Sequence, residues 1–396
     1  MNNLFKKLKT IWWREKSFLA RYCYGNPSSK LKIVGVTGTS GKTTTVTLLY
    51  KIALKLGYRA GLVSTVENLA NGKPLNSGGN GPGTTPDSVT LTKLFKKMAN
   101  EGCEYVFMEV SSHAMDQNRV AGINFTGGIF TNLSQDHFDY HKNFENYFEA
   151  KKKFFRMLSK DAFALSNTDD KYGLRMLEGI KAHKTTYGLD GKVDFNDRLE
   201  TKLIGNFNAY NVLAVYAAAV LLGWDKDKVK NVLKTVEPPR GRFEYFNALN
   251  GVTVIVDYAH KPDALQKVLD TINKIKKEGN RVISIFGCGG DRDTLKRPIM
   301  GKIGAENSDI AIFTSDNPRS EDPEKIIEEM KRDLSVNLLQ KVKSISNRRE
   351  AIAEAVRIAQ KGDIIICAGK GHENYQDIKG VKHNFDDMEE LKGALK

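Results

Sequence analysis

The sequence predicts an α/β fold with two consecutive domains, each built on a parallel sheet. Two observations predict this fold. Short apolar runs alternate with helical patterns from residue 31 to about 236, as expected when helices cover a parallel sheet. The alternation stops at Glu237-Pro238-Pro239-Arg240-Gly241 and then restarts. We therefore expect a basic, aromatic segment at 1–30, a first domain at 31–236 and a second domain at 237–396.

The first domain contains apolar runs of a length that suits buried strands, at 31–36, 105–110 and 128–131. Helical patterns follow at 46–56 and 143–158. A loop rich in Gly, Asn and Pro spans residues 76–86. Its composition fits a mobile substrate-facing loop and an ordinary surface loop equally well.

The second domain repeats the pattern, with strand-like runs at 252–256, 281–286, 310–313 and 363–367. Because helical segments separate these runs, the pattern predicts a doubly wound, Rossmann-like domain. Polar motifs follow the strand-like runs in both domains. Open parallel sheets bind ligands at the carboxyl ends of their strands, so these motifs are the candidate functional sites.

The composition is that of a globular protein, with 40% hydrophobic and 27% charged residues. No apolar run is long enough to span a bilayer, and the basic N-terminus lacks the apolar core of a signal peptide. The four cysteines have no paired spacing, which argues against a zinc cluster and favours a reducing, cytoplasmic location.

The formal net charge of +14 raises the question of nucleic-acid binding. The lysines are spread along the chain, and no basic run is interleaved with stacking aromatic residues. We therefore expect a lysine-rich surface and a site for small polyanions, without a nucleic-acid partner.

The most informative motif is the stretch 36–45, Val-Thr-Gly-Thr-Ser-Gly-Lys-Thr-Thr-Thr, between a predicted strand and a predicted helix. Backbone N–H groups in such a turn can surround a phosphate. Lys42 adds a positive charge, and the hydroxyl of Thr43 can bind Mg²⁺. The usual first glycine is replaced by Val36, and the loop begins at Gly38, so the loop is a variant. This motif predicts a P-loop ATPase-like first domain.

Two clusters in the first domain close strand-like runs. Glu109 lies in Met-Glu-Val-Ser-Ser-His at 108–113, where a carboxylate beside a phosphate loop is well placed to hold Mg²⁺. His137 lies in a segment at 131–141 that packs two histidines and two aspartates into a short span. Together they favour a metal and substrate site. The spacing of the lysine run 151–153 on a helix does not single out one lysine.

The second domain has four strand-end motifs, at 257–262, 287–293, 316–319 and 368–373. Arginine binds a carboxylate through two parallel hydrogen bonds, and a carboxylate can hold an ammonium group. Arg292, Arg319 and Glu373 therefore suit a zwitterionic amino acid, although salt bridges between loops would use the same residues.

Taken together, these motifs resemble the Mur ligase family, in the form that adds a third amino acid to a muramyl dipeptide in peptidoglycan synthesis. The resemblance runs from about Pro27 to the C-terminus in unbroken motif order. It implies an ATP-dependent amide-forming ligase that works through an acyl phosphate, with a central ATP-binding domain and a C-terminal domain for the incoming amino acid.

The resemblance also implies roles in the first domain. Catalysis would involve Lys42, Glu109, His137 and Lys151, the last as a carbamylated lysine, and Thr43, Glu109 and His137 would hold Mg²⁺. ATP would contact Gly38, Thr39, Ser40, Gly41, Lys42, Thr43, Thr44, Asn208 and Asn211, and, from the second domain, Arg242 and Asp257. The muramyl peptide would contact Thr84, Thr85, Ser111 and Arg119.

In the second domain, the Asp-Asn-Pro-Arg motif at 316–319 resembles the form found in relatives that add meso-diaminopimelate. Relatives that add lysine typically lack its arginine. The residues implied for amino-acid binding are Arg292, Asp316, Asn317, Arg319, Gly369 and Glu373.

Two departures from the family bear on the acceptor. Only about thirty residues precede the phosphate loop, so the N-terminal domain that binds UDP in relatives is expected to be absent, and the segment 187–203 is short. Two alternatives therefore stay open. One is a non-catalytic or partner-dependent nucleotide-binding subunit, and the other is a ligase that acts on a lipid-linked or non-muramyl acceptor.

The N-terminal segment suggests one further contact. Leu4, Leu8, Ile11 and Phe18 fall near one helical face, with basic residues on the others. A basic amphipathic helix that carries tryptophans can lie on an anionic membrane. The favoured alternative is a helix packed on its own core or on a partner domain.

Overall fold

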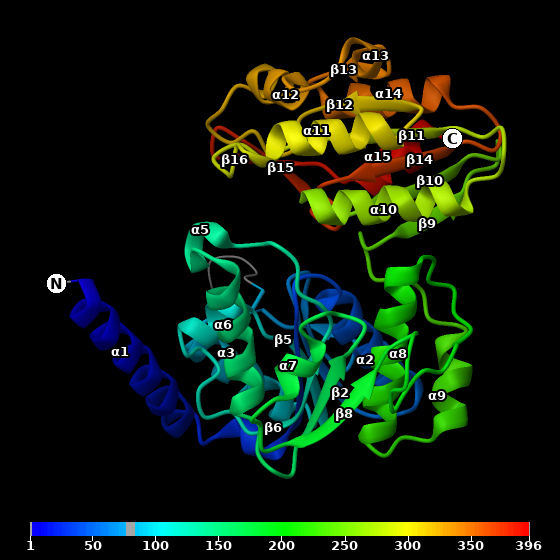
Figure 1. The fold of residues 1–396 in the computed structure, drawn as a ribbon. Helices are drawn as coiled ribbons and strands as arrows, with labels where there is room; N and C mark the ends of the chain where they lie inside the picture. Colours follow the sequence, from blue (N-terminus) through cyan, green and yellow to red (C-terminus); the bar gives the residue numbers. More distant parts are fainter. Residues whose placement is uncertain (1, 77–83, 396) are drawn as a thin grey trace. The chain divides into compact units, whose positions relative to one another are not determined.

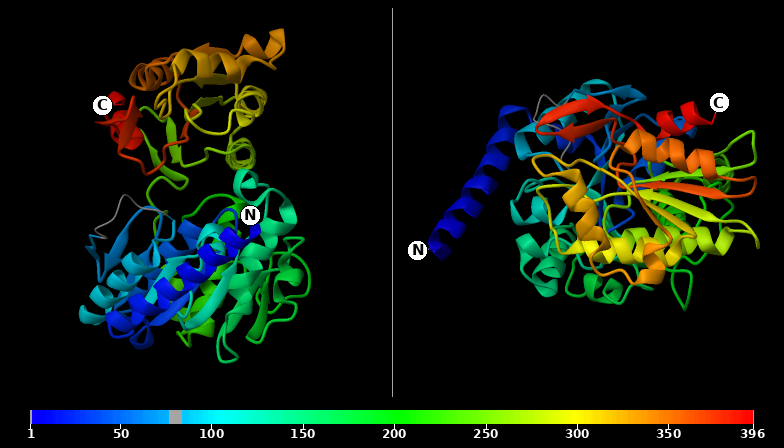
Figure 2. Two further views of the ribbon diagram at one scale, coloured as in Figure 1. Left: turned by 90° about the vertical axis from the view of Figure 1, so that its left-hand side faces the viewer. Right: turned by 90° about the horizontal axis from the view of Figure 1, so that it is seen from above.

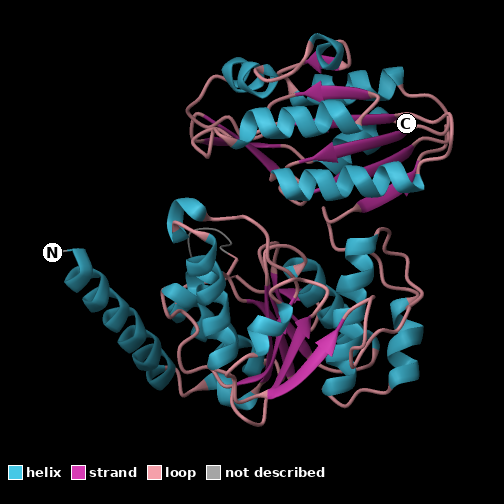
Figure 3. Cartoon of the chain, in the orientation of Figure 1, coloured by secondary structure: helices cyan, strands magenta, loops and turns pink. Residues whose placement is uncertain are grey.

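In the computed structural model, which describes residues 2–76 and 84–395, the chain divides into two compact units, Met1–Glu237 and Pro238–Lys396. Each unit is built on its own sheet with helices on both faces (Figures 1 and 3). This confirms the predicted α/β class with two sheet domains. Of the helices in the described part of the chain, none is long and apolar enough to cross a lipid bilayer.

The first unit holds a sheet whose described strands run in the order β4-β3-β2-β5-β1-β6-β7-β8. Their bounds are β1 Lys32–Thr37, β2 Ala60–Val63, β3 Asn68–Ala70, β4 Lys73–Pro74, β5 Tyr105–Glu109, β6 Phe125–Phe130, β7 Phe163–Asn167 and β8 His183–Tyr187. All neighbours pair in parallel except β2 with β3 and β3 with β4. The sequence did not predict this antiparallel edge, because strands this short carry little periodicity.

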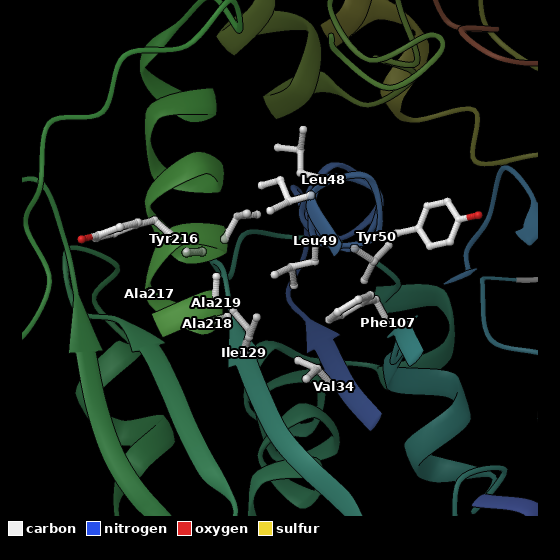
Figure 4. Close-up of a cluster of buried hydrophobic side chains, with 14 of the residues drawn as sticks. Val34, Leu48, Leu49, Tyr50, Phe107, Ile129, Tyr216, Ala217, Ala218 and Ala219 are labelled. Atoms are coloured by element: carbon white, nitrogen blue, oxygen red, sulfur yellow. The ribbon is translucent and has the colours of Figure 1, made fainter. Parts of the chain in front are cut away.

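The helices of the first unit cover both faces of the sheet. They are α1 Asn2–Cys23, η1 Pro27–Lys30, α2 Lys42–Lys55, α3 Ser88–Asn100, α4 Ser112–Asp116, α5 Phe138–His141, α6 Phe144–Arg156, α7 Gly173–Leu177, α8 Asn206–Leu221 and α9 Lys226–Leu233. Figure 4 shows the core on the face of α2 and α8, where Leu49 and Ala218 meet Val34 and Ile129 of the sheet. A second core on the other face includes Phe95, Phe148 and Met176.

The second unit has described strands in the order β13-β12-β11-β14-β10-β9, with β9 antiparallel to its neighbour, and a separate hairpin, β15-β16. The strands are β9 Glu244–Asn247, β10 Thr253–Asp257, β11 Val282–Phe286, β12 Ile310–Phe313, β13 Val342–Ser344, β14 Ile364–Ala368, β15 Tyr375–Ile378 and β16 Val381–Asn384. The helices are α10 Pro262–Ile275, α11 Lys296–Asn307, α12 Pro323–Lys331, α13 Val336–Leu339, α14 Arg348–Ile358 and α15 Asp387–Ala394. Figure 2 shows α14 and α15 on one face of the sheet, with α10 and α11 on the other.

Several predicted elements need adjustment. The helix predicted at 46–56 begins at Lys42, because the phosphate loop runs directly into it. The segment 1–30 forms α1 and η1. Most of the Gly- and Asn-rich loop predicted at 76–86 lies outside the described residues, and so do the side chains of Leu4, Leu8 and Ile11.

Candidate active site

The phosphate loop joins β1 to α2, and its two glycines have backbone conformations that other residues adopt with strain. Gly38 has φ of 151° and Gly41 has φ of 84°. A Cβ on Gly38 would lie 1.9 Å from Thr131 Oγ1, and one on Gly41 would lie 2.4 Å from Asn211 Oδ1. Glycine is therefore required at both positions, and α2 starts with its N-terminal N–H groups at the loop.

The strand next to β1 holds this loop in place. After β6, the Asn132 side chain accepts from Ser40 N at 3.0 Å and donates to Ser40 O at 3.1 Å. Thr131 Oγ1 also donates to Ser40 O, at 2.7 Å. Neither Thr131 nor Asn132 is among the residues for which the sequence predicted a role. Their position directly after a predicted strand was the available signal, but only the order of strands in the sheet shows that β6 neighbours β1.

Two lysines converge on one carbonyl oxygen of the loop. Lys42 Nζ donates to Gly38 O at 2.8 Å and to Thr39 O at 2.8 Å. Lys151 Nζ donates to the same Gly38 O at 2.7 Å, from a side chain on α6 that is only 1% exposed. The structure thus distinguishes Lys151 from its neighbours in the lysine run. Lys152 instead reaches Glu178, at 3.8 Å.

Glu109 and Thr43 meet beneath the loop. Thr43 Oγ1 donates to Glu109 Oε1 at 2.9 Å, and the backbone N–H of Thr65 donates to the same oxygen at 2.8 Å. Glu109 is 1% exposed at the end of β5, the other neighbour of β1. A hydroxyl and a carboxylate in contact offer oxygen ligands of the kind that Mg²⁺ prefers, so this pair fits a magnesium ion.

His137 lies on the segment between β6 and α5 and has a left-handed backbone, with φ of 55°. Its Nε2 is 3.2 Å from Asp136 Oδ2, and its ring centroid is 4.7 Å from that of His113. Within the described residues, no group of three or more His, Cys, Asp or Glu side chains is assembled as a metal cluster. The predicted set of Thr43, Glu109 and His137 contains only two such residues and stays a prediction.

Three of the residues predicted to contact the muramyl peptide form one network. Thr85 Oγ1 donates to the carbonyl of Glu109 at 2.9 Å and accepts from Ser111 N at 3.0 Å. Arg119 Nη1 donates to Thr85 O at 2.6 Å. Thr84 is half-buried beside Thr85. The network therefore adjoins the carboxylate that contacts the phosphate loop.

Asn208 and Asn211 lie in the first turns of α8, and both are buried. Asn211 Nδ2 donates to Asn208 Oδ1 at 3.2 Å, and Asn208 Nδ2 donates to Ile204 O at 2.8 Å. Because Asn211 lies against Gly41, the structure brings this predicted pair to the phosphate loop.

In the second unit, Asp257 ends β10 and accepts from the Phe243 backbone N–H at 2.7 Å. Burial raises the pKa of Asp257 to about 6, and the nearby Arg242 opposes that shift. The Arg242 guanidinium lies 4.5 Å from the Tyr258 ring centroid. Burial also lowers the pKa of His260 to about 3, so this imidazole is neutral near pH 7.

A second cluster gathers at the ends of β12 and β14. Asn317 Nδ2 donates to Glu373 Oε2 at 2.8 Å. Lys370 Nζ, on a side chain with 0% exposure, lies 3.1 Å from Asn317 Oδ1 and 3.3 Å from Glu373 Oε2. Sequence reasoning missed Lys370, because a lysine in a glycine-rich turn is usually solvated. A Cβ on Gly369 would lie 2.7 Å from Asp316 Oδ2, which places these two predicted residues side by side.

Arg319 lies between two loops of this unit. Its Nη1 donates to Gly290 O at 2.6 Å, and its backbone N–H donates to Asp377 O of β15 at 3.0 Å. Arg292 is exposed and donates to the carbonyl of Asp291 in its own loop, at 3.1 Å. The structure therefore integrates Arg319 into the loop cluster and leaves Arg292 at the surface.

Comparison with known proteins identifies the two units. Residues 36–219 match the Mur ligase middle domain, and residues 241–371 match the Mur ligase glutamate ligase domain. The UDP-N-acetylmuramoyl-L-alanyl-D-glutamate–2,6-diaminopimelate ligase of Cytophaga hutchinsonii is 50% identical over 394 residues, which cover 95% of this chain and 80% of that protein. The protein of the same name from Clostridium perfringens is 41% identical, over 92% of this chain and 78% of that protein.

Solved structures agree with this assignment. A structure of a UDP-N-acetylmuramoyl-L-alanyl-D-glutamate–2,6-diaminopimelate ligase is 33% identical, with a TM-score of 0.65 over 92% of this chain and 78% of that chain. A Mycobacterium tuberculosis folylpolyglutamate synthase has a TM-score of 0.71 at 18% identity, over 90% of this chain and 92% of that chain, and so shares the fold.

Proposed function

Because this chain belongs to the Mur ligase family, we propose that it is an ATP-dependent carbon–nitrogen ligase that adds meso-diaminopimelate to a muramyl dipeptide in peptidoglycan synthesis. One structural observation carries the proposal: Glu109 at the end of β5 contacts Thr43 of the phosphate-loop motif, and Lys151 of α6 contacts Gly38 of the same motif. A loop that only bound a phosphate would need neither the buried carboxylate of Glu109 nor the buried lysine Lys151 beside it, whereas phosphoryl transfer with a metal ion can use both.

The reaction that fits this geometry is amide formation in two steps. A carboxylate oxygen of the acceptor attacks the γ-phosphorus of ATP, the bond to the ADP oxygen breaks, and an acyl phosphate forms. The amine then attacks the acyl carbon, loses a proton, and phosphate leaves with the former carboxylate oxygen. Lys42 and the N-terminus of α2 bind the phosphates, and Mg²⁺, when bound, offsets charge on the transferred group. Thr43, Glu109 and His137 are the proposed magnesium ligands.

The other predicted roles extend this proposal. Gly38 to Thr44, Asn208 and Asn211 would contact ATP from the first unit, and Arg242 and Asp257 from the second. Thr85, Ser111 and Arg119, with Thr84, would hold the muramyl peptide. The amino acid would be held by the second-unit residues Arg292, Asp316, Asn317, Arg319, Gly369 and Glu373. We propose a cytoplasmic location, where ATP and the nucleotide-linked precursor are available.

The direct test is an assay of ADP release in which UDP-muramyl dipeptide is crossed with several amino acids. We expect release that depends on both the dipeptide and meso-diaminopimelate. A protein that binds ATP but releases no ADP with any amino acid would be a nucleotide-binding subunit. Release with a lipid-linked dipeptide alone would instead identify that acceptor.

We also propose that Lys151 is carbamylated in the active enzyme. Lys42 and Lys151 donate to one carbonyl oxygen, and two ammonium groups this close repel each other in a buried site. A carbamate on Lys151 would replace one cation by an anion near the magnesium ligands.

Neighbouring lysines provide the test of carbamylation. Lys151→Ala should lower turnover by about 10²-fold, and a short carboxylic acid that fills the space should restore part of it. Lys152→Ala, a matched loss of a buried lysine on the same helix, should leave turnover near the wild-type value. Equal losses in the two variants, or no rescue of Lys151→Ala, would contradict the proposal.

Finally, we propose that α1 makes a peripheral contact, with a partner protein as the favoured reading and an anionic membrane surface as the alternative. Ser17 packs inward and donates to Asn118 O, whereas Trp12, Leu19 and Tyr22 are 59%, 64% and 85% exposed. Exposed aromatic and basic side chains on one helix suit a lipid headgroup region. Binding to anionic vesicles that added salt weakens would support the membrane alternative. Absence of binding at low salt would favour a protein partner for this helix instead.

A further inference from the structure

Tyr147 on α6 lies between the phosphate loop, Lys151 and the histidine segment. Its side chain is 1% exposed, and its hydroxyl lies 3.2 Å from Thr39 Oγ1 in the loop. Lys151 Nζ lies 4.5 Å from the centre of the Tyr147 ring. The ring centroids of His141 and His137 lie 5.4 Å and 6.1 Å from it. One buried aromatic side chain therefore contacts the loop, the lysine that binds the loop, and the histidine segment.

The donors and acceptors around Thr39 Oγ1 indicate what the Tyr147 hydroxyl does. Thr39 Oγ1 accepts from Ser134 N at 3.0 Å and has one proton, which the Ser134 carbonyl accepts at 3.2 Å. When that proton is directed at the Ser134 carbonyl, the Tyr147 hydroxyl donates to Thr39 Oγ1. Tyr147 thus completes the hydrogen bonding of the loop threonine.

A second aromatic–lysine pair on α6 provides a comparison with Tyr147 and Lys151. Phe148 and Lys152 repeat the aromatic–lysine spacing one position along, with Lys152 Nζ 5.6 Å from the Phe148 ring centroid. Of this second pair, Lys152 contacts the exposed Glu178 and, within the described part of the chain, forms no hydrogen bond to the phosphate loop. Only the pair directed at the phosphate loop carries a hydroxyl, so packing of an aromatic ring against a lysine does not by itself require tyrosine.

We propose that Tyr147 is a positioning residue for nucleotide binding: its hydroxyl fixes Thr39, and its ring supports Lys151 beneath Gly38. This inference rests on the proposed function only in that the loop binds a nucleotide. The loop carbonyls of Gly38 and Thr39 also hold Lys42, so a shift of Thr39 would displace the lysine that meets the phosphates.

The test compares two buried tyrosines in the first unit that each lose one hydroxyl. Tyr147→Phe should weaken the binding of ADP with Mg²⁺, measured by calorimetry, by about tenfold, and raise the KM for ATP while leaving the KM for the amino acid unchanged. Tyr50→Phe is the matched control, because Tyr50 is 3% exposed and its hydroxyl accepts from Gly72 N at 2.7 Å. It should lower thermal stability without changing nucleotide affinity.

A double variant sharpens the test. Thr39→Val and Tyr147→Phe remove the same bond, so their combined effect on ADP affinity should be little more than that of Thr39→Val alone. If Tyr147→Phe binds ADP as tightly as the wild type, or loses only stability as Tyr50→Phe does, the inference is wrong while the proposed function stands. If the wild-type protein binds no nucleotide, both fail together.

Discussion

The two units stabilise their functional loops by different chemistry. In the first unit, neutral side chains order the Ser40 turn of the phosphate loop: Asn132 binds both the N–H and the carbonyl of Ser40, and Thr131 binds that carbonyl. The charged Lys42 and Lys151 bind the Gly38 carbonyl of the same loop. In the second unit, buried ion pairs order the loops. The guanidinium of Arg348 forms two bonds to Asp387, at 2.7 and 2.8 Å, with both side chains at 0% exposure, and also donates to Ala368 O at the end of β14.

A second ion pair joins the two loops that contain Arg292 and Arg319. Arg297 of α11 is fully buried and binds Glu321 through two bonds, at 2.8 and 2.9 Å, while Glu321 also accepts from Asp291 N at 2.5 Å. At Ser40, the neutral amide and hydroxyl groups add no negative charge to a loop that is proposed to receive phosphates. The amino acid proposed to bind beside the second-unit loops is a zwitterion and brings both signs of charge, so paired charges around these loops are tolerated.

The largest expected effect tests this contrast directly. Arg348→Met should lower the stability of the second unit by about 3–5 kcal/mol, because it leaves Asp387 buried without its partner. Asn132→Ala in the first unit removes only neutral bonds and should cost about 1–3 kcal/mol, together with a loss of nucleotide affinity. Urea denaturation of both variants measures the difference. Equal costs would show that the two units do not differ in this way.

Removal of the loop lysine should affect chemistry and leave the fold intact. Lys42→Ala should lower ATP turnover by about 10²–10³-fold, since the proposed role of its ammonium group is to contact the phosphates. Lys55→Ala, at the exposed end of the same helix, is the control and should turn over ATP normally. If Lys42→Ala is folded by circular dichroism and turns over ATP at the wild-type rate, the phosphate loop does not bind ATP through Lys42 as proposed.

In the second unit, Arg319→Ala should act on the amino acid rather than on ATP. Loss of a charge-assisted contact to a buried carboxylate costs about 2–5 kcal/mol, which should appear as a raised KM for diaminopimelate at an unchanged KM for ATP. Arg332→Ala changes an exposed arginine of the same unit, paired with Asp333, and should have no effect. A wild-type enzyme that prefers lysine would overturn the assignment of Arg319.

The smallest expected effect concerns pH. The pKa of Asp257 in the folded protein, about 6, lies above its ordinary value of 3.8, so between these pH values the folded state retains a proton that the unfolded chain releases. Ionisation of Asp257 therefore lowers the free energy of unfolding progressively as the pH rises between these two pKa values. The loss of stability persists above pH 6. Asp257→Asn should match the wild type near pH 4 and exceed it by roughly 2 kcal/mol near pH 7.5. Denaturation at the two pH values measures this difference, and a constant offset would contradict it.

The sequence by itself predicted the features that depend on local pattern. The apolar runs predicted β1, β5, β6 and the central strands of the second unit, because a buried strand is a short continuous run of apolar residues. The spacing of glycine, lysine and threonine at 36–45 predicted the phosphate loop for the same reason. The sequence singled out Glu109 as a candidate because a carboxylate at the end of a strand lies at the edge of the sheet where ligands bind, and the structure places Glu109 at the end of β5.

Only the tertiary structure decided which of several equivalent residues meet at the loop. Lys151 and Lys152 are adjacent, both are buried, and each follows an aromatic residue by four positions, yet only Lys151 reaches Gly38. The choice follows from the rotation of α6 against the sheet. Likewise, Glu109 and Asn132 flank the loop because β1 lies between β5 and β6. Sheet order and helix rotation are set by packing between segments distant in the chain, so no local spacing encodes them.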